Sequence, residues 1–395
     1  MLKKENEQCR DNCWWKIMRI GIITWFTGPN YGTNLQAIAL QYYLRKQGYA
    51  VELVNCEVES AYSKNRRTLI EKIEFFPEKW AQKFARRVFF KKEKEIRDKK
   101  LKKAIHKNCI LTRQCEDEKD LIEVFNSFDL LISGSDQIWN PNWYHRFYYA
   151  DYEGVTTRRI SYAPSMGVTK ILDEVEPEIK RSVSKFEAVS VREENAVSLL
   201  EPYSKYKPIV VVDPTLLLDS NDWASILPPT GEAPKNDYVL GFFIEGNFDH
   251  LHATKKFAKQ KKMKYVFVPY SGLSYYQIGD RRADAGLEDL LELIRNARYV
   301  ITDSFHITVF SIIYRKQFYS FMRYRENPVT STNSRIRNLL HMAGLENRGL
   351  EFGTRKIKEL PDIDYAPHMK MLRQEIEKSK EFLQKSIRGE YRGEV

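Results

Sequence analysis

Cysteine and long apolar runs are both scarce in this chain. Five cysteines occur in 395 residues, an odd number that favours a reducing compartment, and none has the C-x2-C spacing of a zinc site, so we expect inert thiols. The two longest apolar stretches, 209–218 and 299–314, are broken by Asp213 and Pro214 and by Asp303 and His306, well short of the about 18 residues of a membrane span. The first seventeen residues contain acids and amides and lack the apolar core of a secretory signal. These absences predict a cytoplasmic protein.

Several motifs that mark common enzyme classes are missing as well. The loop at 28–32, GPNYG, is not G-x-G-x-x-G, and the chain contains no G-x-x-x-x-G-K-[ST], H-E-x-x-H or G-x-S-x-G. Dinucleotide or P-loop binding, metal catalysis and serine hydrolysis therefore lose support, and we expect no metal site.

The chain has ample material for packed cores and an uneven charge. Hydrophobic residues make up 43% and aromatic residues 13% of the sequence, whose net charge is +11. Residues 83–107 alone contribute +9, with 12 Lys and Arg against 3 Asp and Glu. Nucleic acid is the weakest explanation, because no reader module accompanies the charge. A contact with an anionic membrane through 80–107, with Trp80, Phe84, Val88 and Phe89 in the interface, and a merely solvated helical face both stay open.

The order of apolar strands and helical segments predicts two α/β domains. Strand-like runs at 19–25, 50–55, 129–133, 159–163, 187–191 and 209–212 alternate with turns and helices. After a Pro-rich break the same pattern restarts at 238, 264, 299 and 318. We predict an N-terminal extension (1–17), a Rossmann-like domain (18–220) with a basic helical insertion (58–114), a second Rossmann-like domain (236–366) and a charged C-terminal helix (367–395). The two domains would face each other across a cleft.

Polar residues follow many of these strands, where ligands bind in open α/β sheets. They include Asn30 and Asn34, Asp136 and Gln137, Arg192, Asp213, and Ser304 with His306. His306 precedes a predicted helix, so it either transfers a proton beside an anion at the helix N-terminus or only completes a turn. Arg192 either holds a carboxylate or phosphate or pairs with Glu193 or Asp213 as scaffolding.

Taken in order, the segments LLISGSDQIWNP, VSVREENAVSLL, VVVDPTLLL and RYVITDSFH, with GIITWFTGPNYGTNLQ and ISYAPSMG, resemble the polysaccharide pyruvyl transferase family. The resemblance covers roughly residues 18–344. It implies a fold like that of the glycosyltransferase-B enzymes, with phosphoenolpyruvate (PEP) bound between the domains as donor and a pyruvate ketal formed on a saccharide. It implies no further cofactor.

The resemblance also assigns residues. Arg192 matches the family's PEP-binding arginine and His306 its catalytic histidine, and Phe305 would contribute a backbone contact to PEP. We also expect Ser304, which precedes Phe305, to bind PEP. Where the family reads Ser-Phe-His-Gly, this chain has Ile307, whose branched side chain adds bulk that bears on PEP fit or acceptor choice. On the rim of the first domain, Asn30, Asn34, Asp136 and Gln137 are our hypothesis for contacts to the acceptor sugar.

The sequence thus predicts a transferase of capsule, exopolysaccharide or cell-wall polymer assembly at the cytoplasmic side of the membrane, and leaves open whether its acceptor is lipid-linked. Two rival interpretations stay open. One is a glycosyltransferase of the same architecture with a nucleotide-sugar donor, and the other is a saccharide-binding relative without turnover, which Ile307 keeps in view.

Overall fold

The structure is a computed structural model that describes residues 17–56, 90–244, 247–270, 274–275, 277–325 and 333–393. Within these ranges no helix combines the length and the apolar character needed to cross a bilayer. Residues 1–16 of the predicted extension and residues 58–89 of the predicted basic insertion lie outside the described residues.

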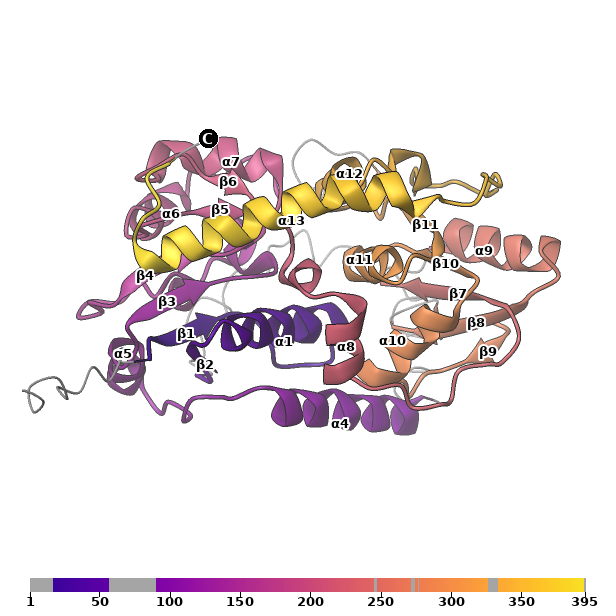
Figure 1. The fold of residues 1–395 in the computed structure, drawn as a ribbon, viewed down its shortest axis with the longest axis horizontal. Coiled ribbons are helices and arrows are strands. Elements are labelled where there is room, and N and C mark those ends of the chain that lie inside the picture. Colours follow the sequence, from indigo (N-terminus) through magenta and orange to yellow (C-terminus); the bar gives the residue numbers. More distant parts are fainter. Residues whose placement is uncertain are drawn as a thin grey trace, which may run out of the picture.

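A parallel sheet forms the core of the N-terminal half (Figure 1). Its strands lie in the order β2-β1-β3-β4, with the bounds β1 Arg19–Ile23, β2 Ala50–Leu53, β3 Leu130–Ser133 and β4 Arg158–Ser161. The short strands β5 (Ser190–Val191) and β6 (Ile209–Val210) pair with each other, and a bridge from Ile160 to Ala188 joins them to β4. Continuous apolar runs such as RIGII and LLIS are typical of parallel strands that are covered on both faces.

The helices of the N-terminal half pack around this sheet and against one another. They are α1 Tyr31–Lys46, α4 Lys91–Asn108, α5 Glu118–Asn126, α6 Glu176–Val183 and α7 Glu194–Leu200. Asn30 begins α1 by accepting hydrogen bonds from the backbone N–H groups of Gly32 and Thr33. The 3-10 helix η5 (Pro214–Leu217) and α8 (Ser220–Ile226) then lead to the second sheet.

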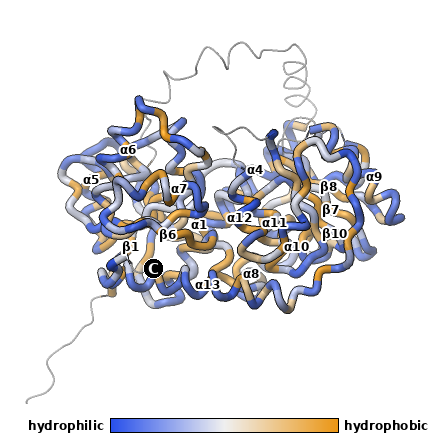
Figure 2. The backbone as a smooth tube through the Cα atoms, turned by 90° about the horizontal axis from the view of Figure 1, so that it is seen from above, coloured by the Kyte–Doolittle hydropathy of each residue, from blue (hydrophilic) through white to orange (hydrophobic). Residues whose placement is uncertain are grey.

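The C-terminal half contains a second parallel sheet in the order β12-β11-β10-β7-β8-β9. Its strands are β7 Tyr238–Phe243, β8 Lys264–Pro269, β9 Asp280–Arg281, β10 Tyr299–Thr302, β11 Gln317–Phe321 and β12 Gly349–Leu350. The helices are α9 Phe248–Gln260, α10 Leu287–Asn296, α11 Phe305–Ile313 and α12 Ser334–Met342. Figure 2 shows hydrophobic segments gathered inside each half and hydrophilic segments outside. The predicted fold class, two Rossmann-like α/β units, is confirmed.

The last helix, α13 (Tyr365–Arg388), packs along both halves instead of standing free in solvent (Figure 1). Leu383 is fully buried, and Phe382 and Leu372 are nearly so. Toward the N-terminal half, the Ser379 hydroxyl accepts a hydrogen bond from the Val212 N–H at 2.9 Å. Toward the C-terminal half, the Tyr365 hydroxyl donates to the Lys316 carbonyl at 2.6 Å.

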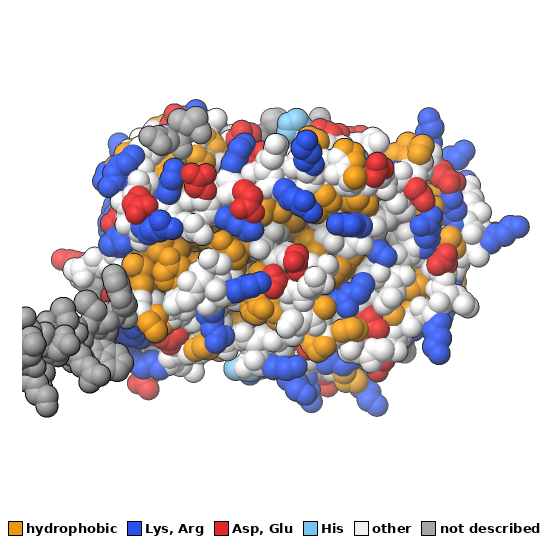
Figure 3. Space-filling model, viewed as in Figure 1, with side chains coloured by type: hydrophobic (Ala, Val, Ile, Leu, Met, Phe, Trp, Pro, Cys, Tyr) orange, Lys and Arg blue, Asp and Glu red, His pale blue; other side chains and the backbone are white. Residues whose placement is uncertain are grey.

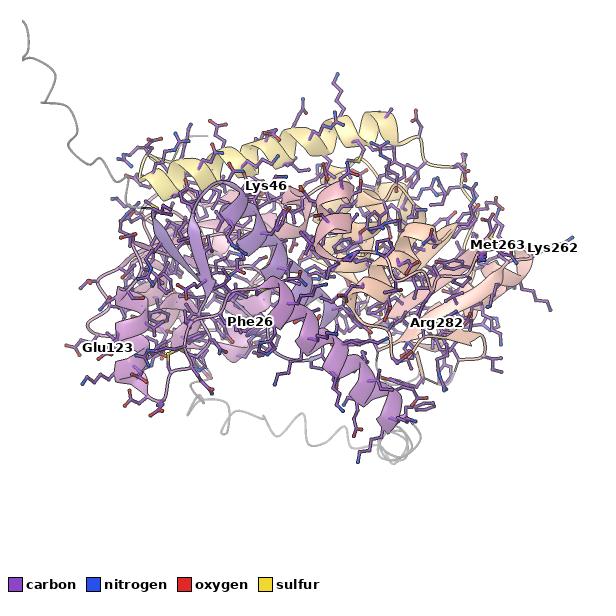
Figure 4. The ribbon with its side chains drawn as sticks, turned by 60° about the horizontal axis from the view of Figure 1, so that its bottom comes forward. Phe26, Lys46, Glu123, Lys262, Met263 and Arg282 are labelled. Atoms are coloured by element: carbon purple, nitrogen blue, oxygen red, sulfur yellow. A yellow bond between two sulfur atoms is a disulfide. The ribbon has the colours of Figure 1, made fainter. Side chains whose placement is uncertain are left out.

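The basic helix α4 also connects the two halves, as Figure 4 shows along the lower side of the molecule. Leu101 and Ile105 belong to the same buried cluster as α1. Lys100 pairs with Asp289 of α10 at 2.8 Å, and Arg97 is buried with a hydrogen bond to the Tyr275 hydroxyl at 3.2 Å. Part of the basic segment is therefore structural, while Trp80, Phe84, Val88 and Phe89 lie outside the described residues.

Cysteine chemistry differs from the expectation of inert thiols. Cys56 and Cys115 form a disulfide between the end of β2 and the segment before α5, and Cys109 is a buried free thiol. The two partners are 59 residues apart, so only the folded chain brings them together.

We predict that Leu383→Ala lowers the free energy of unfolding by about 2–5 kcal/mol, because it leaves a cavity under α13. Chemical denaturation of the whole chain measures this loss. The exposed Lys370→Ala on the same helix is the control and should change stability by less than about 0.5 kcal/mol. Equal stability of the two variants would mean that α13 does not pack as described.

Candidate functional site

Carboxyl ends of strands from both sheets meet at one place. Asp136 follows β3, Arg192 follows β5 and Asp213 follows β6 in the N-terminal half. His306 lies in the first turn of α11, which begins directly after β10 in the C-terminal half. The Nε2 atom of His306 lies 3.6 Å from Oδ2 of Asp213, so the two sheets contribute to a single site.

Asp213 is the centre of this site. Its side chain is fully buried, and its Oδ2 accepts a hydrogen bond from Arg192 at 2.7 Å. Its Oδ1 accepts from the backbone N–H and the hydroxyl of Thr215 at 3.0 and 2.7 Å. Burial alone would raise the pKa of Asp213, but His306 and Arg192 hold it well below its usual range. Asp213 is therefore held in its ionised form between the Arg192 guanidinium and the His306 imidazole.

Arg192 pairs with two acidic side chains. Besides Asp213, it contacts Oδ1 of Asp136 at 3.4 Å, and its guanidinium lies 4.6 Å from the ring centroid of Phe305. The scaffolding alternative for Arg192 thus has a counterpart in the structure, with Asp213 as the partner instead of Glu193. Its role toward PEP stays a prediction.

Asp136 is held in an unusual backbone conformation. Its φ of +73° is rare for a residue with a side chain, and such positions cluster at functional sites. Its carboxylate accepts a hydrogen bond from the Thr33 hydroxyl at 2.8 Å as well as from Arg192. Burial would raise the pKa of Asp136, but Arg192, His306 and Arg335 lower it.

The imidazole of His306 lies against the first turn of α1. A Cβ atom added to Gly32 would lie only 2.0 Å from Nδ1 of His306, so the ring occupies space that a larger residue would fill. The Nε2 atom is buried without a hydrogen-bond partner. His306 therefore reaches across to the N-terminal half, where its Nε2 faces the Asp213 carboxylate.

The other predicted residues are placed as follows. Asn34 is buried and both of its amide atoms lack a partner, as does Nε2 of Gln137. Asn30 is exposed and its oxygen caps α1. Ser304 is the N-cap of α11, where its backbone N–H donates to the Thr302 hydroxyl at 2.9 Å. Ile307 packs into the hydrophobic core, so the core accommodates its bulk.

Two arginines at this site escaped the sequence analysis. Arg335 lies in the first turn of α12 and is only 6% exposed, and Arg323 follows β11. Burial and then the positive charges of Arg192 and Arg323 lower the pKa of Arg335 to about 9. A signal for Arg335 exists in the segment SRIRNLLHM. Ile336, Leu339 and Leu340 have the spacing of a buried helix face, and Arg335 stands next to that face.

Other features of the described chain do not mark a competing site. Across the described ranges, no three His, Cys, Asp or Glu side chains cluster as metal ligands. A surface groove of about 830 Å³ lies between η5, α8, α11 and α13, where Figure 3 shows apolar side chains beside Lys and Arg, but none of the polar site residues lines it.

We predict that Asp213→Asn lowers the free energy of unfolding by roughly 3–5 kcal/mol, because the buried guanidinium of Arg192 loses its charged partner. Denaturation at pH 7 measures it. The pKa of Asp213 is lowered in the folded protein, so its ionised form stabilises the fold above roughly pH 4, and this stabilisation is lost as the pH falls. The difference in free energy of unfolding between wild type and Asp213→Asn should therefore become smaller in acid.

The control is Asp219→Asn in α8. Asp219 is an exposed N-cap, and asparagine caps helices equally well, so stability should be unchanged. If both variants had the same stability, Asp213 would not be the buried ionic centre described.

Comparisons with known proteins place this geometry in context. The structure resembles a UDP-GlcNAc 2-epimerase from Methanocaldococcus jannaschii with a TM-score of 0.50 and 11% identity, over 90% of this chain and 92% of that chain. A UDP-GlcNAc 2-epimerase from Neisseria meningitidis (TM-score 0.49, 9% identity, 93% and 100% covered) and the glycosyltransferase SnogD from Streptomyces nogalater (0.48, 12%, 95% and 100%) are also similar. At such identities the first likeness shows the fold alone, of glycosyltransferase-B type. No curated protein matches the sequence.

The sequence model of one family, described as polysaccharide pyruvyl transferase, matches residues 30–324. That match includes all the strands given above except β1 and β12, and every site residue described above except Arg335. The chain belongs to the polysaccharide pyruvyl transferase family.

Proposed function

We propose that this protein transfers the enolpyruvyl group of PEP to two hydroxyls of a saccharide and forms a pyruvate ketal. The observation that carries the proposal is the joint site, in which His306 from one half lies beside Asp213 and Arg192 from the other. Membership of the family supports the transferase class. An anionic donor also suits a site where the positive charges of Arg192 and Arg323 act on the buried Arg335.

The chemistry needs a proton donor and acceptor between two substrates. A proton must reach the methylene carbon of PEP, which makes C2 electrophilic, and a sugar hydroxyl then adds to C2. Inorganic phosphate leaves with cleavage of the bond between C2 and oxygen, and a second hydroxyl closes the ketal. One hydroxyl proton ends on the new methyl group and the other leaves with phosphate, so atoms balance.

His306 is the group that we propose for proton transfer, and Asp213 orients its ring. Both ring nitrogens of His306 face the N-terminal half: Nδ1 faces Gly32 and Nε2 faces Asp213. Ser304 and Phe305 place the N-terminus of α11 at the same point, where backbone N–H groups favour an anion. PEP is the donor substrate, and the proposal requires no resident cofactor.

For the acceptor we propose Asn34 and Gln137 as the contacts most available to a sugar. Both amide atoms of Asn34 and Nε2 of Gln137 are buried without partners among the described residues. Asn30, in contrast, caps α1, and Asp136 is engaged by Thr33 and Arg192. Unpaired buried amides are costly unless a ligand satisfies them. The proposed setting is capsule, exopolysaccharide or cell-wall polymer assembly at the cytoplasmic side of the membrane, and the proposal holds with or without a lipid on the acceptor.

We predict acceptor-dependent release of phosphate from PEP, with kcat reduced about 100-fold or more in His306→Ala, the usual scale for loss of a general acid or base. A coupled phosphate assay with galactosides, glucosides and mannosides measures it. His252→Ala, an exposed histidine of α9, is the matched control and should keep wild-type activity.

Thermal unfolding of the same protein distinguishes PEP from a nucleotide sugar as the donor. Protection against thermal unfolding by PEP and not by uridine or guanosine diphosphate sugars supports the proposal. Protection by a nucleotide sugar alone would favour a glycosyltransferase, and PEP binding without phosphate release from any acceptor would favour a non-catalytic relative.

We further propose that the exposed face of α4 meets an anionic membrane. Lys99, Lys102 and Lys103 are exposed there, next to the structural Lys100 and Arg97. Replacing these three lysines by Gln should weaken binding to phosphatidylserine vesicles roughly 100-fold at low salt, from about 1 kcal/mol per lysine. The same change at Lys255, Lys256 and Lys259 of α9 is the control. Failure of the wild type to co-sediment with such vesicles at physiological salt would exclude this contact.

A further inference from the structure

The charge of Arg192 is already balanced before any ligand arrives. One terminal nitrogen donates to Asp213 at 2.7 Å, and the other lies 3.4 Å from Asp136. The residue is 2% exposed, with Phe305 lying over its guanidinium. Burial alone would lower the pKa of Arg192, but Asp213 and Asp136 raise it above the usual range, as expected for a guanidinium facing two carboxylates. The two terminal nitrogens of Arg192 thus already face carboxylates before an anion arrives, although its Nε is buried without a partner, as it is in Arg335.

Arg335 has the opposite surroundings. It is 6% exposed, its Nε is buried without a partner, and within the described chain no carboxylate forms an ion pair with it. Burial, and then the positive charges of Arg192 and Arg323, lower the pKa of Arg335, against the weaker attraction of Asp136 and Glu193. A buried guanidinium without a counter-ion is unfavourable in a folded protein unless a ligand supplies the negative charge.

Arg323 supports the same location from another element. Its terminal nitrogen donates to the carbonyl of Asp303 at 3.1 Å, directly before α11, and its Nε is also buried without a partner. One terminal nitrogen is thus fixed beside the turn that presents Ser304, Phe305 and His306.

Hydrogen bonds of two asparagines fix the position of α12, the helix that carries Arg335. The side chain of Asn333, which begins α12, accepts from the backbone N–H of Arg323 at 3.0 Å. Asn338 of the same helix donates to the backbone carbonyl of Arg192 at 3.0 Å. The first turn of α12 is therefore fixed against both the end of β11 and the N-terminal half, so Arg335 is organised without a ligand.

We propose that Arg335, assisted by Arg323, binds the phosphoryl group of the donor, and that Arg192 is a positioning residue that holds Asp213 and Asp136. The identity of that donor as PEP rests on the proposed function, whereas the phosphoryl site itself does not. The main anion contact then lies on α12 and not at the strand end that carries Arg192.

The test compares Arg335→Gln and Arg192→Gln with Arg337→Gln, an exposed arginine on the same helix as Arg335. Inorganic phosphate and PEP are titrated separately into each full-length protein by calorimetry, and the melting temperature is recorded without ligand. For Arg335→Gln we expect binding of both anions to weaken about 10- to 100-fold, the range for a charge-assisted hydrogen bond, with a melting temperature equal to or above that of wild type. Arg337→Gln should bind as wild type does.

Arg192→Gln should instead lower the melting temperature, because it leaves two buried aspartates without their cation. Arg335→Lys keeps the charge and loses the planar fork, so it should recover part of the phosphate affinity. Arg323→Gln, at a less buried position, gives the same readout should Arg335→Gln fold poorly.

The outcomes separate the two proposals. Phosphate binding that depends on Arg335 in a protein that releases no phosphate from PEP would support the site and contradict the proposed function. Turnover of PEP by Arg335→Gln with an unchanged KM would support the proposed function and contradict the phosphoryl site. Undiminished phosphate affinity in Arg335→Gln, or a loss of stability equal to that of Arg192→Gln, would overturn the inference.

Discussion

Burial of the Asp213 carboxylate between Arg192 and His306 is the interaction on which the rest of the site depends. A fully buried carboxylate is tolerable only with charged and hydrogen-bonded partners, and here they come from both halves of the molecule. Arg192 and Thr215 approach from the N-terminal half, and His306 approaches from the C-terminal half. The same contacts that satisfy one charge therefore fix how the two sheets meet at their carboxyl ends.

The charges around this centre do not cancel everywhere. Asp213 and Asp136 neutralise Arg192, but Arg335 is left buried among cations. Stability alone would disfavour this arrangement, and proteins commonly give up stability where a ligand must bind. The site is thus divided into a balanced part, which orients His306, and an unbalanced positive part on α12.

Rigid connections hold this divided site in place. The helix α13 hydrogen-bonds to both halves through Ser379 and Tyr365, and α4 joins α1 to α10 through Lys100. At the joint itself, Tyr31 donates a hydrogen bond to the Ala285 carbonyl at 2.7 Å. Because the site lies between these connections, at strand ends and first turns of helices, its side chains are organised in the absence of substrate.

The sequence by itself determined the elements and the composition of the rim. Apolar runs such as YVIT and polar residues directly after them gave the strands, the parallel α/β class and the positions of Arg192, Asp213 and His306, because strand ends can be recognised locally. Tertiary structure decided which of these side chains are balanced. Three of its contacts join residues at least 21 positions apart: Arg192 with Asp213, His306 with Gly32, and Cys56 with Cys115. The burial of Arg335 likewise depends on segments that are distant in the sequence. Charge balance in a buried site is a property of three-dimensional neighbours, and no periodicity along the chain encodes it.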